Sequence, residues 1–312
     1  MAGSPLRHVG YVDLPEHRAK GGFDHAAVHG ASGHVYVAHT ANDAVDVFDP
    51  ATRRHLFSIP DASGVAGVLV SDEAQRIIIS NRAADTISVF APGRDPSVRS
   101  IKVGMRPNGL AYDPRRQMVL AANVGDPNVP GSHTVSIVDL APDGKCIETA
   151  VPGRTRWAIF DPGPELFYVN IADPAEIVIV DPRQPHRIAG AFAIPHAGPH
   201  GLDLDGSTHR LFCACDAGVL VTLDARSGRV LDERPLSGVP DVVFFNRQRQ
   251  QLYVAVGDPG VIDVFTTSTM ERLATVVTEA GAHTTALSPA GDRLYAFLPR
   301  THRAAIYEIA GD

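Results

Sequence analysis

The feature that most constrains this sequence is a unit that recurs seven times along the whole chain. Each copy reads as an apolar strand, a turn that often begins with Asp-Pro, a second strand, a polar loop and a third strand; in the first copy the three strands fall at residues 26–28, 35–39 and 44–49. Successive first strands end 42, 42, 48, 44, 41 and 42 residues apart, at His29, Ser71, Asp113, Asp161, Asp205, Asn246 and Ser288. Spacing this even indicates one structural unit per copy.

A period of this length with several short strands per unit is typical of a β-propeller. Composition agrees, because short Val, Ile, Thr and aromatic runs are separated by turn residues, among them 28 Gly and 24 Pro. The sequence therefore predicts one all-β domain over residues 1–312, a seven-bladed propeller with four antiparallel strands in each blade.

The last copy predicts how the ring closes. A fourth strand follows in the other copies, as at residues 55–59, 98–103 and 272–278, whereas only 24 residues follow Ser288. Residues 6–14 have strand character and belong to no other copy. We expect this N-terminal segment to complete the seventh blade and remove an exposed sheet edge.

Three second strands carry a family likeness. Residues 35–39 (VYVAH), 166–170 (LFYVN) and 251–255 (QLYVA) resemble the repeat core of the YVTN family of seven-bladed propellers. The resemblance spans essentially the whole chain and implies the fold. It implies no single function, because propellers serve as hydrolases, lyases, isomerases, oxidoreductases and plain scaffolds.

Charge and hydrophobicity restrict the classes of partner that we expect. The formal net charge is −7 and no basic run is present, so nucleic acid is not expected as a partner. No stretch of eighteen apolar residues suggests a membrane segment, and residues 1–14 lack the apolar core of a signal peptide. We expect a cytoplasmic protein that acts on a small molecule, with its oligomeric state left open.

Chemistry is expected at one mouth of the central channel, where first strands begin. The residues five positions before each strand end form an axial ring of Asp24, Ala66, Asn108, Arg156, His200, Asp241 and His283. The residues that follow them are His25, Gly67, Gly109, Trp157, Gly201, Val242 and Thr284. One half of the ring is rich in imidazoles and carboxylates, and the other half carries Asn, Arg and Trp.

Two roles follow from these residue types. His200, Asp241, His283 and His25 come from consecutive blades and are predicted to hold a divalent transition metal such as Zn, Mn, Fe or Ni, with the first three as catalytic residues. The predicted substrate-binding residues are Asn108, Arg156, Trp157, Asp24 and His39, where Arg156 pairs with an anionic group. His39 and Asn123 end second strands beside this ring. A polar ring around a water-filled channel requires no ligand at all, which is the alternative for the whole set.

The residues favour an enzyme, a metal-dependent hydrolase or lyase of a small anionic or lactone-like molecule. Streptogramin lyases and gluconolactonase-like propellers are similar in kind, since they place a divalent ion on the axis, but this ring has no Glu, so their ligand sets do not transfer. A non-catalytic propeller that binds a ligand or a protein is the first alternative. A metal-dependent oxidoreductase is the second.

Overall fold

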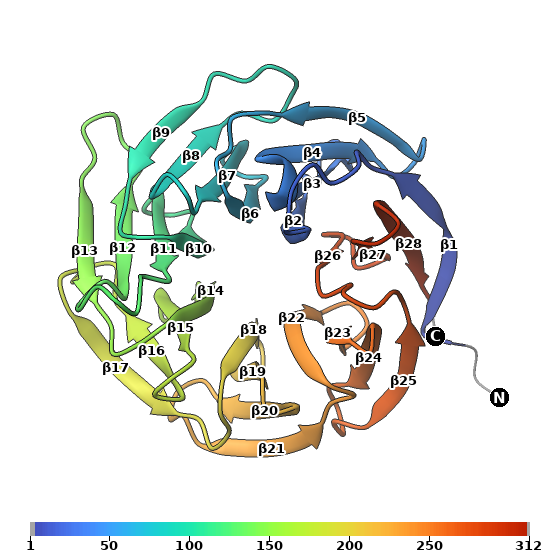
Figure 1. The fold of residues 1–312 in the computed structure, drawn as a ribbon. Helices are drawn as coiled ribbons and strands as arrows, with labels where there is room; N and C mark the ends of the chain where they lie inside the picture. Colours follow the sequence, from blue (N-terminus) through green and yellow to red (C-terminus); the bar gives the residue numbers. More distant parts are fainter. Residues whose placement is uncertain (1–3, 311–312) are drawn as a thin grey trace.

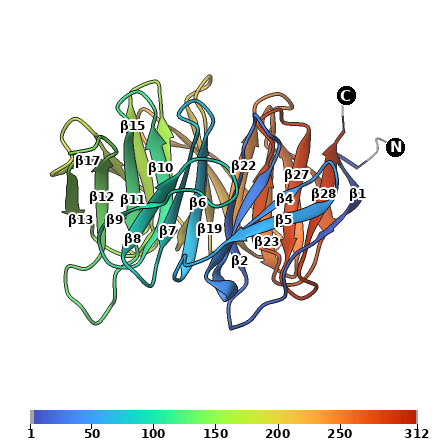
Figure 2. The same cartoon turned by 90° about the horizontal axis from the view of Figure 1, so that it is seen from above.

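The computed structural model describes residues 4–310 and confirms the seven-bladed propeller. Seven antiparallel sheets of four strands each surround a central axis in chain order (Figure 1). Seen from the side, the sheets stand roughly along this axis and their connecting loops gather at the two ends (Figure 2). Within residues 4–310 no helix is long and apolar enough to cross a bilayer.

In blades one to six the strands run outward from the axis in chain order, and in blade seven the outermost strand is the N-terminal β1. Blades one and two contain β2 (Phe23–Val28), β3 (Val35–His39), β4 (Ala44–Asp49) and β5 (Arg54–Ile59), then β6 (Val65–Ser71), β7 (Arg76–Asn81), β8 (Thr86–Phe90) and β9 (Arg99–Lys102). Blades three and four contain β10 (Pro107–Asp113), β11 (Met118–Asn123), β12 (Thr134–Asp139) and β13 (Cys146–Ala150), then β14 (Thr155–Asp161), β15 (Leu166–Ile171), β16 (Glu176–Val180) and β17 (Ile188–Ala193). Blades five and six contain β18 (Pro199–Asp205), β19 (Arg210–Cys215), β20 (Val219–Asp224) and β21 (Val230–Pro235), then β22 (Val239–Asn246), β23 (Gln251–Asp258), β24 (Val261–Thr266) and β25 (Arg272–Val277). Blade seven contains β26 (Thr285–Leu287), β27 (Arg293–Leu298) and β28 (Arg303–Ile309), and a short 3-10 helix, η1 (Thr40–Asn42), follows β3.

The N-terminal strand closes the ring as predicted. Strand β1 (Leu6–Asp13) pairs antiparallel with β28, from Leu6 opposite Ile309 to Asp13 opposite Arg303. Val12 is fully buried in the core between blades seven and one. The two described ends of the chain thus lie in one sheet (Figure 1), and β28 has no free edge.

The apolar cores lie between neighbouring blades. Tyr168 of blade four, for example, packs in one cluster with Leu202, Leu211 and Cys213 of blade five. The flat faces of the sheets bury these side chains against each other, so the channel mouths can carry polar residues without weakening the core.

A local irregularity turns the axial residues into the channel. In six blades the pairing between the first and second strands shifts register at the axial residue. In β18 the shift lies between Pro199 and Gly201, which leaves His200 alone outside the ladder, and in the other five the residue after the axial one is unpaired as well. The equivalent shifts occur in β2, β6, β10, β14 and β22. Such bulges re-aim side chains near functional sites.

Glycine lets neighbouring blades approach at the same level. A Cβ on Gly201 would lie 2.2 Å from the carbonyl oxygen of Asp241 in the next blade. A Cβ on Gly67 would likewise lie 2.3 Å from the carbonyl oxygen of Asn108, and a Cβ on Gly109 would lie 2.5 Å from that of Arg156. The axial residues are therefore positioned by close backbone contact that only glycine permits.

Candidate functional site

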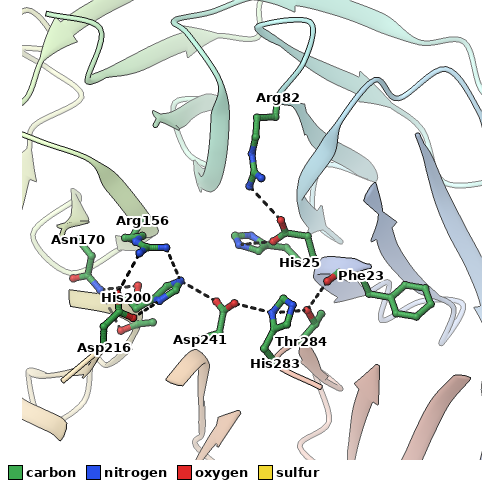
Figure 3. Close-up of polar contacts among 12 residues, drawn as sticks. Phe23, His25, Arg82, Arg156, Asn170, His200, Asp216, Asp241, His283 and Thr284 are labelled. Carbon is green, nitrogen blue, oxygen red and sulfur yellow. Dashed lines mark hydrogen bonds and ion pairs between the residues drawn. The ribbon is translucent and has the colours of Figure 1, made fainter. Parts of the chain in front are cut away.

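A cavity of about 190 Å³ opens at the mouth where the first strands begin, and we call it the axial pocket. It is lined by Asp24, His25, Arg82, Asn108, Arg154, Arg156, Trp157, His200, Asp241 and His283. The structure thus gathers in one place eight of the nine residues singled out from the sequence. Figure 3 shows several of them around the channel.

The polar centre of the pocket is a row of alternating carboxylates and imidazoles. Asp216 Oδ1 lies 2.7 Å from Nδ1 of His200, and Nε2 of His200 lies 3.3 Å from Oδ1 of Asp241. The other carboxylate oxygen of Asp241 lies 2.7 Å from Nδ1 of His283 (Figure 3). We call Asp216, His200, Asp241 and His283 the axial chain.

Two arrangements are open to the second ring nitrogen of His200. Its Nε2 also lies 3.2 Å from a guanidinium nitrogen of Arg156. A neutral ring can accept a hydrogen bond from Arg156, whereas a protonated ring donates to Asp241. Arg156 is itself held 3.2 Å from Asp216, and Asn170 donates to the backbone carbonyl of His200 at 2.9 Å. His200 therefore sits in a fixed frame between a cation and an anion.

The charges of the axial chain shift its ionisation. Burial raises the pKa of Asp241, but His200 and His283 beside it outweigh that effect and hold the pKa well below its usual range. Burial lowers the pKa of His283, but the hydrogen bond and the charge of Asp241 together raise it by more than burial lowers it. The net shift is therefore upward from 6.5. The pKa of Asp216 is lowered, since burial is outweighed by the hydrogen bond and charge of His200 and the charge of Arg156.

His25 and Trp157 stack against each other within the pocket lining. Their ring centroids lie 4.1 Å apart at an interplanar angle of 37°, and Trp157 also meets Phe244 edge-on. His25 is buried, and that burial lowers its pKa despite Asp24, whose carboxylate lies 3.5 Å from Nε2. A neutral imidazole packed on an indole gives the pocket one apolar wall.

Three arginines, Arg82, Arg154 and Arg156, also line the axial pocket. Arg82 pairs with Asp24 at 3.2 Å, and Arg156 pairs with Asp216. Arg154 is exposed and makes no ion pair with any other residue of the 4–310 region. Partial loss of solvent around its head group and the neighbouring charges of Arg156, Arg82 and Arg106 lower the pKa of Arg154. Positive charge thus surrounds the guanidinium of Arg154, which has no carboxylate partner within residues 4–310.

Some buried polar atoms of the pocket have no partner in the described part of the chain. They are Oδ1 of Asn108, Nε of Arg82 and Nε of Arg156. Buried polar atoms are almost always hydrogen-bonded, to protein, to water or to a ligand. These atoms mark directions from which a bound molecule or ordered water can be held.

The predicted residue outside the pocket is His39. Its Nδ1 lies 2.6 Å from Asp46 and its Nε2 lies 2.7 Å from His17, all within blade one and the segment that leads to it. Asn123, predicted beside it, points into its own sheet and donates to Thr134 and Ser136. Both end second strands, where the last side chain turns into the blade.

Sequence reasoning missed Arg82, Arg154 and Asp216. Arg82 and Asp216 occupy the same position of the repeat, one residue past the second strand, which ends at Asn81 in one blade and Cys215 in the other. Arg154 precedes the first strand of its blade. A tally of the first residue after each second strand would have found two of the three.

Within residues 4–310 no group of three or more His, Cys, Asp or Glu side chains is arranged to hold a metal ion. The imidazoles of the axial pocket are instead paired with carboxylates, and Arg156 occupies the neighbourhood of His200 Nε2. The predicted metal ligands His25, His200, Asp241 and His283 are thus brought to one pocket, where His200 and His283 lie against carboxylates and His25 stacks on Trp157.

Comparison with known proteins identifies the fold alone. The chain matches no protein-family model and no curated protein sequence. Among solved structures it is similar to a chain of hydrazine synthase from Kuenenia stuttgartiensis, with a TM-score of 0.79, 15% sequence identity, and coverage of 98% of this chain and 99% of that one. At this identity the likeness establishes a shared propeller architecture.

Proposed function

We propose that this propeller is an enzyme that binds a small anionic molecule in the axial pocket and transfers a proton at it through His283. The observation that carries the proposal is the axial chain, in which two carboxylates and two imidazoles alternate at 2.7, 3.3 and 2.7 Å. Rows of this kind hold an imidazole in one tautomer and stabilise its protonated form.

His283 is the member suited to the proton transfer. Its Nδ1 is engaged by Asp241, which leaves Nε2 to face a bound molecule, and its side chain is 39% exposed. Its pKa is raised above 6.5 by the contact with Asp241, and an imidazole is the side chain that most often serves as both general base and general acid. Asp241 would stabilise the imidazolium form while His283 carries the proton.

Arg154 and Arg156 would hold the anionic group. Arg154 has no partner in the described chain, and a guanidinium offers a planar fork that matches a carboxylate or phosphate. Asn108 lies in the same lining, and its buried side-chain carbonyl oxygen, which has no hydrogen-bond partner within residues 4–310, would accept from a hydroxyl group of the substrate. The apolar His25–Trp157 stack would cover the rest of the molecule.

The size of the pocket limits the substrate. Its 190 Å³ is below the range of roughly 300–1,000 Å³ that holds drug-sized ligands. A small carboxylate or phosphate compound is therefore favoured, and hydrolysis of an ester or lactone, or elimination of a proton next to the carboxylate, are the reactions that one imidazole base supports.

A metal-dependent form of the same reaction stays a prediction. Zn, Mn, Fe or Ni bound by His200, Asp241, His283 and His25 would polarise a carbonyl or activate water. The metal-free form is favoured here because the pairs with Asp216 and Arg156 already engage both ring nitrogens of His200. Elemental analysis of protein purified without chelator separates the two forms, since one equivalent of metal would support the metal-dependent one.

Three further hypotheses concern the family of the chain and two other functions of the axial pocket. Membership of the YVTN family is supported by the Val-Tyr-Val and Leu-Tyr-Val cores, which lie in the second strands β3 and β23. A non-catalytic propeller requires that alanine at His200 or His283 leave a partner's affinity unchanged. A metal-dependent oxidoreductase requires bound metal and an electron acceptor.

Turnover of a defined panel tests the proposed function. The panel contains small esters and lactones that carry a carboxylate or phosphate group. We expect at least one to be turned over, and His283→Gln to lower kcat by about 10²- to 10⁴-fold. Arg154→Gln should raise KM, with a smaller effect on kcat. A His283→Gln variant as active as the parent would overturn the proposal.

A further inference from the structure

The opposite end of the channel holds a second cavity, distinct from the axial pocket. It has a volume of about 490 Å³ and is lined by the ends of the first strands of blades two to four and by Asp203 of blade five. Because every first strand begins at the axial pocket, the ends of these strands reach the other mouth (Figure 2). We call this cavity the distal pocket.

The distal pocket is apolar inside and purely acidic in charge. Leu69, Ala111, Ile159 and Asp203 each stand three residues beyond an axial residue, and all four line the cavity. Leu110 and Phe160 add further apolar surface. The charged residues of its lining are Asp203, Asp72 and Glu73, and no Lys, Arg or His is among them.

Among residues 4–310, Asp203 is a carboxylate without a countercharge. It makes no ion pair with any basic side chain of residues 4–310, and its oxygens accept only backbone N–H groups, from Phe245 at 2.6 Å and Leu204 at 2.8 Å. Burial raises its pKa to about 6 in spite of these two hydrogen bonds. Asp72, by contrast, is turned to blade one, where it accepts from the backbone of Gly30 at 2.7 Å.

We propose that the distal pocket binds a small organic cation, an amine with an apolar body, whose ammonium group pairs with Asp203. The apolar lining would bury the body, and an ammonium would supply the countercharge that Asp203 lacks among residues 4–310. A volume of 490 Å³ falls in the range typical of small-molecule sites. This inference stands apart from the proposed enzyme activity, because it concerns the other mouth and shares no residue with the axial pocket.

Calorimetric titration with a matched pair of probes tests it. Phenethylammonium and its uncharged counterpart 2-phenylethanol have the same apolar body, and at pH 7.5 Asp203 is ionised. We expect the ammonium to bind at least tenfold more tightly than the alcohol. Asp203→Asn should abolish that preference, whereas Asp241→Asn, the same change at the axial pocket, should preserve it.

A second variant keeps the test independent of the backbone hydrogen bonds at Asp203. Leu69→Lys brings an ammonium into the distal pocket and leaves Asp203 intact, so it should remove binding of the probe, while Leu69→Met should retain it. The inference is overturned if the parent shows no preference for the ammonium, if the preference survives Asp203→Asn, or if Asp241→Asn alone removes it.

Discussion

Nδ1 of His283 lies 2.7 Å from Oδ2 of Asp241, the residue at the same repeat position in the preceding blade. The two side chains come from blades seven and six and meet only because both are axial residues of a closed ring. The charge of Asp241 raises the pKa of His283 above 6.5, although burial acts in the opposite direction.

The first prediction concerns this pair. Asp241→Asn removes both the charge and the strong acceptor, so the pKa of His283 should fall below its value in the parent protein. Titration of the imidazole by NMR measures the change directly, without a substrate. Asp72→Asn, at the other mouth, is the control and should leave the His283 titration where it is. An unchanged titration in Asp241→Asn would show that the contact is not made in solution.

A second prediction tests the packing that positions Asp241. Ala at position 201 places a Cβ 2.2 Å from the Asp241 carbonyl oxygen, so the blades must separate or shift. We expect Gly201→Ala to lower the free energy of unfolding by about 1–3 kcal/mol, as overpacking does. It should also displace Asp241 in the axial pocket. Gly206→Ala is a matched control in the same blade, because its new Cβ would meet only Leu204 Cδ2 at 4.0 Å. Equal melting temperatures for the two variants would contradict the close approach.

The ring closure gives a third prediction. Val12 is fully buried on β1, whereas its neighbour Tyr11 is 47% exposed. Val12→Ala should lower the free energy of unfolding by about 2 kcal/mol through lost apolar burial, and Tyr11→Ala should cost much less. Deletion of residues 1–16 should destabilise the whole ring, since it exposes the edge of β28. A truncated chain with an unchanged melting temperature would refute the latch.

A fourth prediction follows from the histidine cluster of blade one. His17 lies against His39 and His302, with the buried Asp46 beyond His39, and burial together with the charges of His39 and His302 lowers the pKa of His17 despite Asp46. A lowered folded-state pKa gives stability that is present above 6.5 and lost as the pH falls through the folded-state value. The melting temperature should therefore drop between pH 7.5 and pH 5.5 by more in the parent than in His17→Asn. An equal drop in both would exclude His17 as a source of acid sensitivity.

The architecture could be predicted from the sequence because the same strand pattern recurs in all seven copies. The first-strand ends at Ser71, Asp113, Asp161, Asp205 and Asn246 coincide with strand ends in the structure, while β2 and β26 end one residue earlier than predicted. The same count found the axial residues, since the bulges recur at one repeat position and turn the same side chain into the channel.

The sequence could not predict which residue at the end of a second strand reaches the axial pocket, because successive side chains of a strand point to opposite faces. His39 ends a second strand and its ring enters the blade, whereas Arg82 and Asp216 stand one residue later and reach the axial pocket. Strand ends are the least certain feature of a sequence pattern, and an error of one residue reverses the face. The contact between Asp216 and His200 could not be predicted for a similar reason. It crosses a hairpin, so it depends on how the two strands pair.

The central claim is that the axial pocket binds a small anion through Arg154, whose guanidinium has no ion-pair partner within residues 4–310. The most direct measurement is calorimetric titration of the purified protein with inorganic phosphate, a probe that fits 190 Å³, alongside Arg154→Gln and the exposed control Arg247→Gln. We predict saturable binding by the parent and by Arg247→Gln, and at least a tenfold weaker affinity in Arg154→Gln. Equal affinities in all three proteins, or no binding by the parent, would contradict the account.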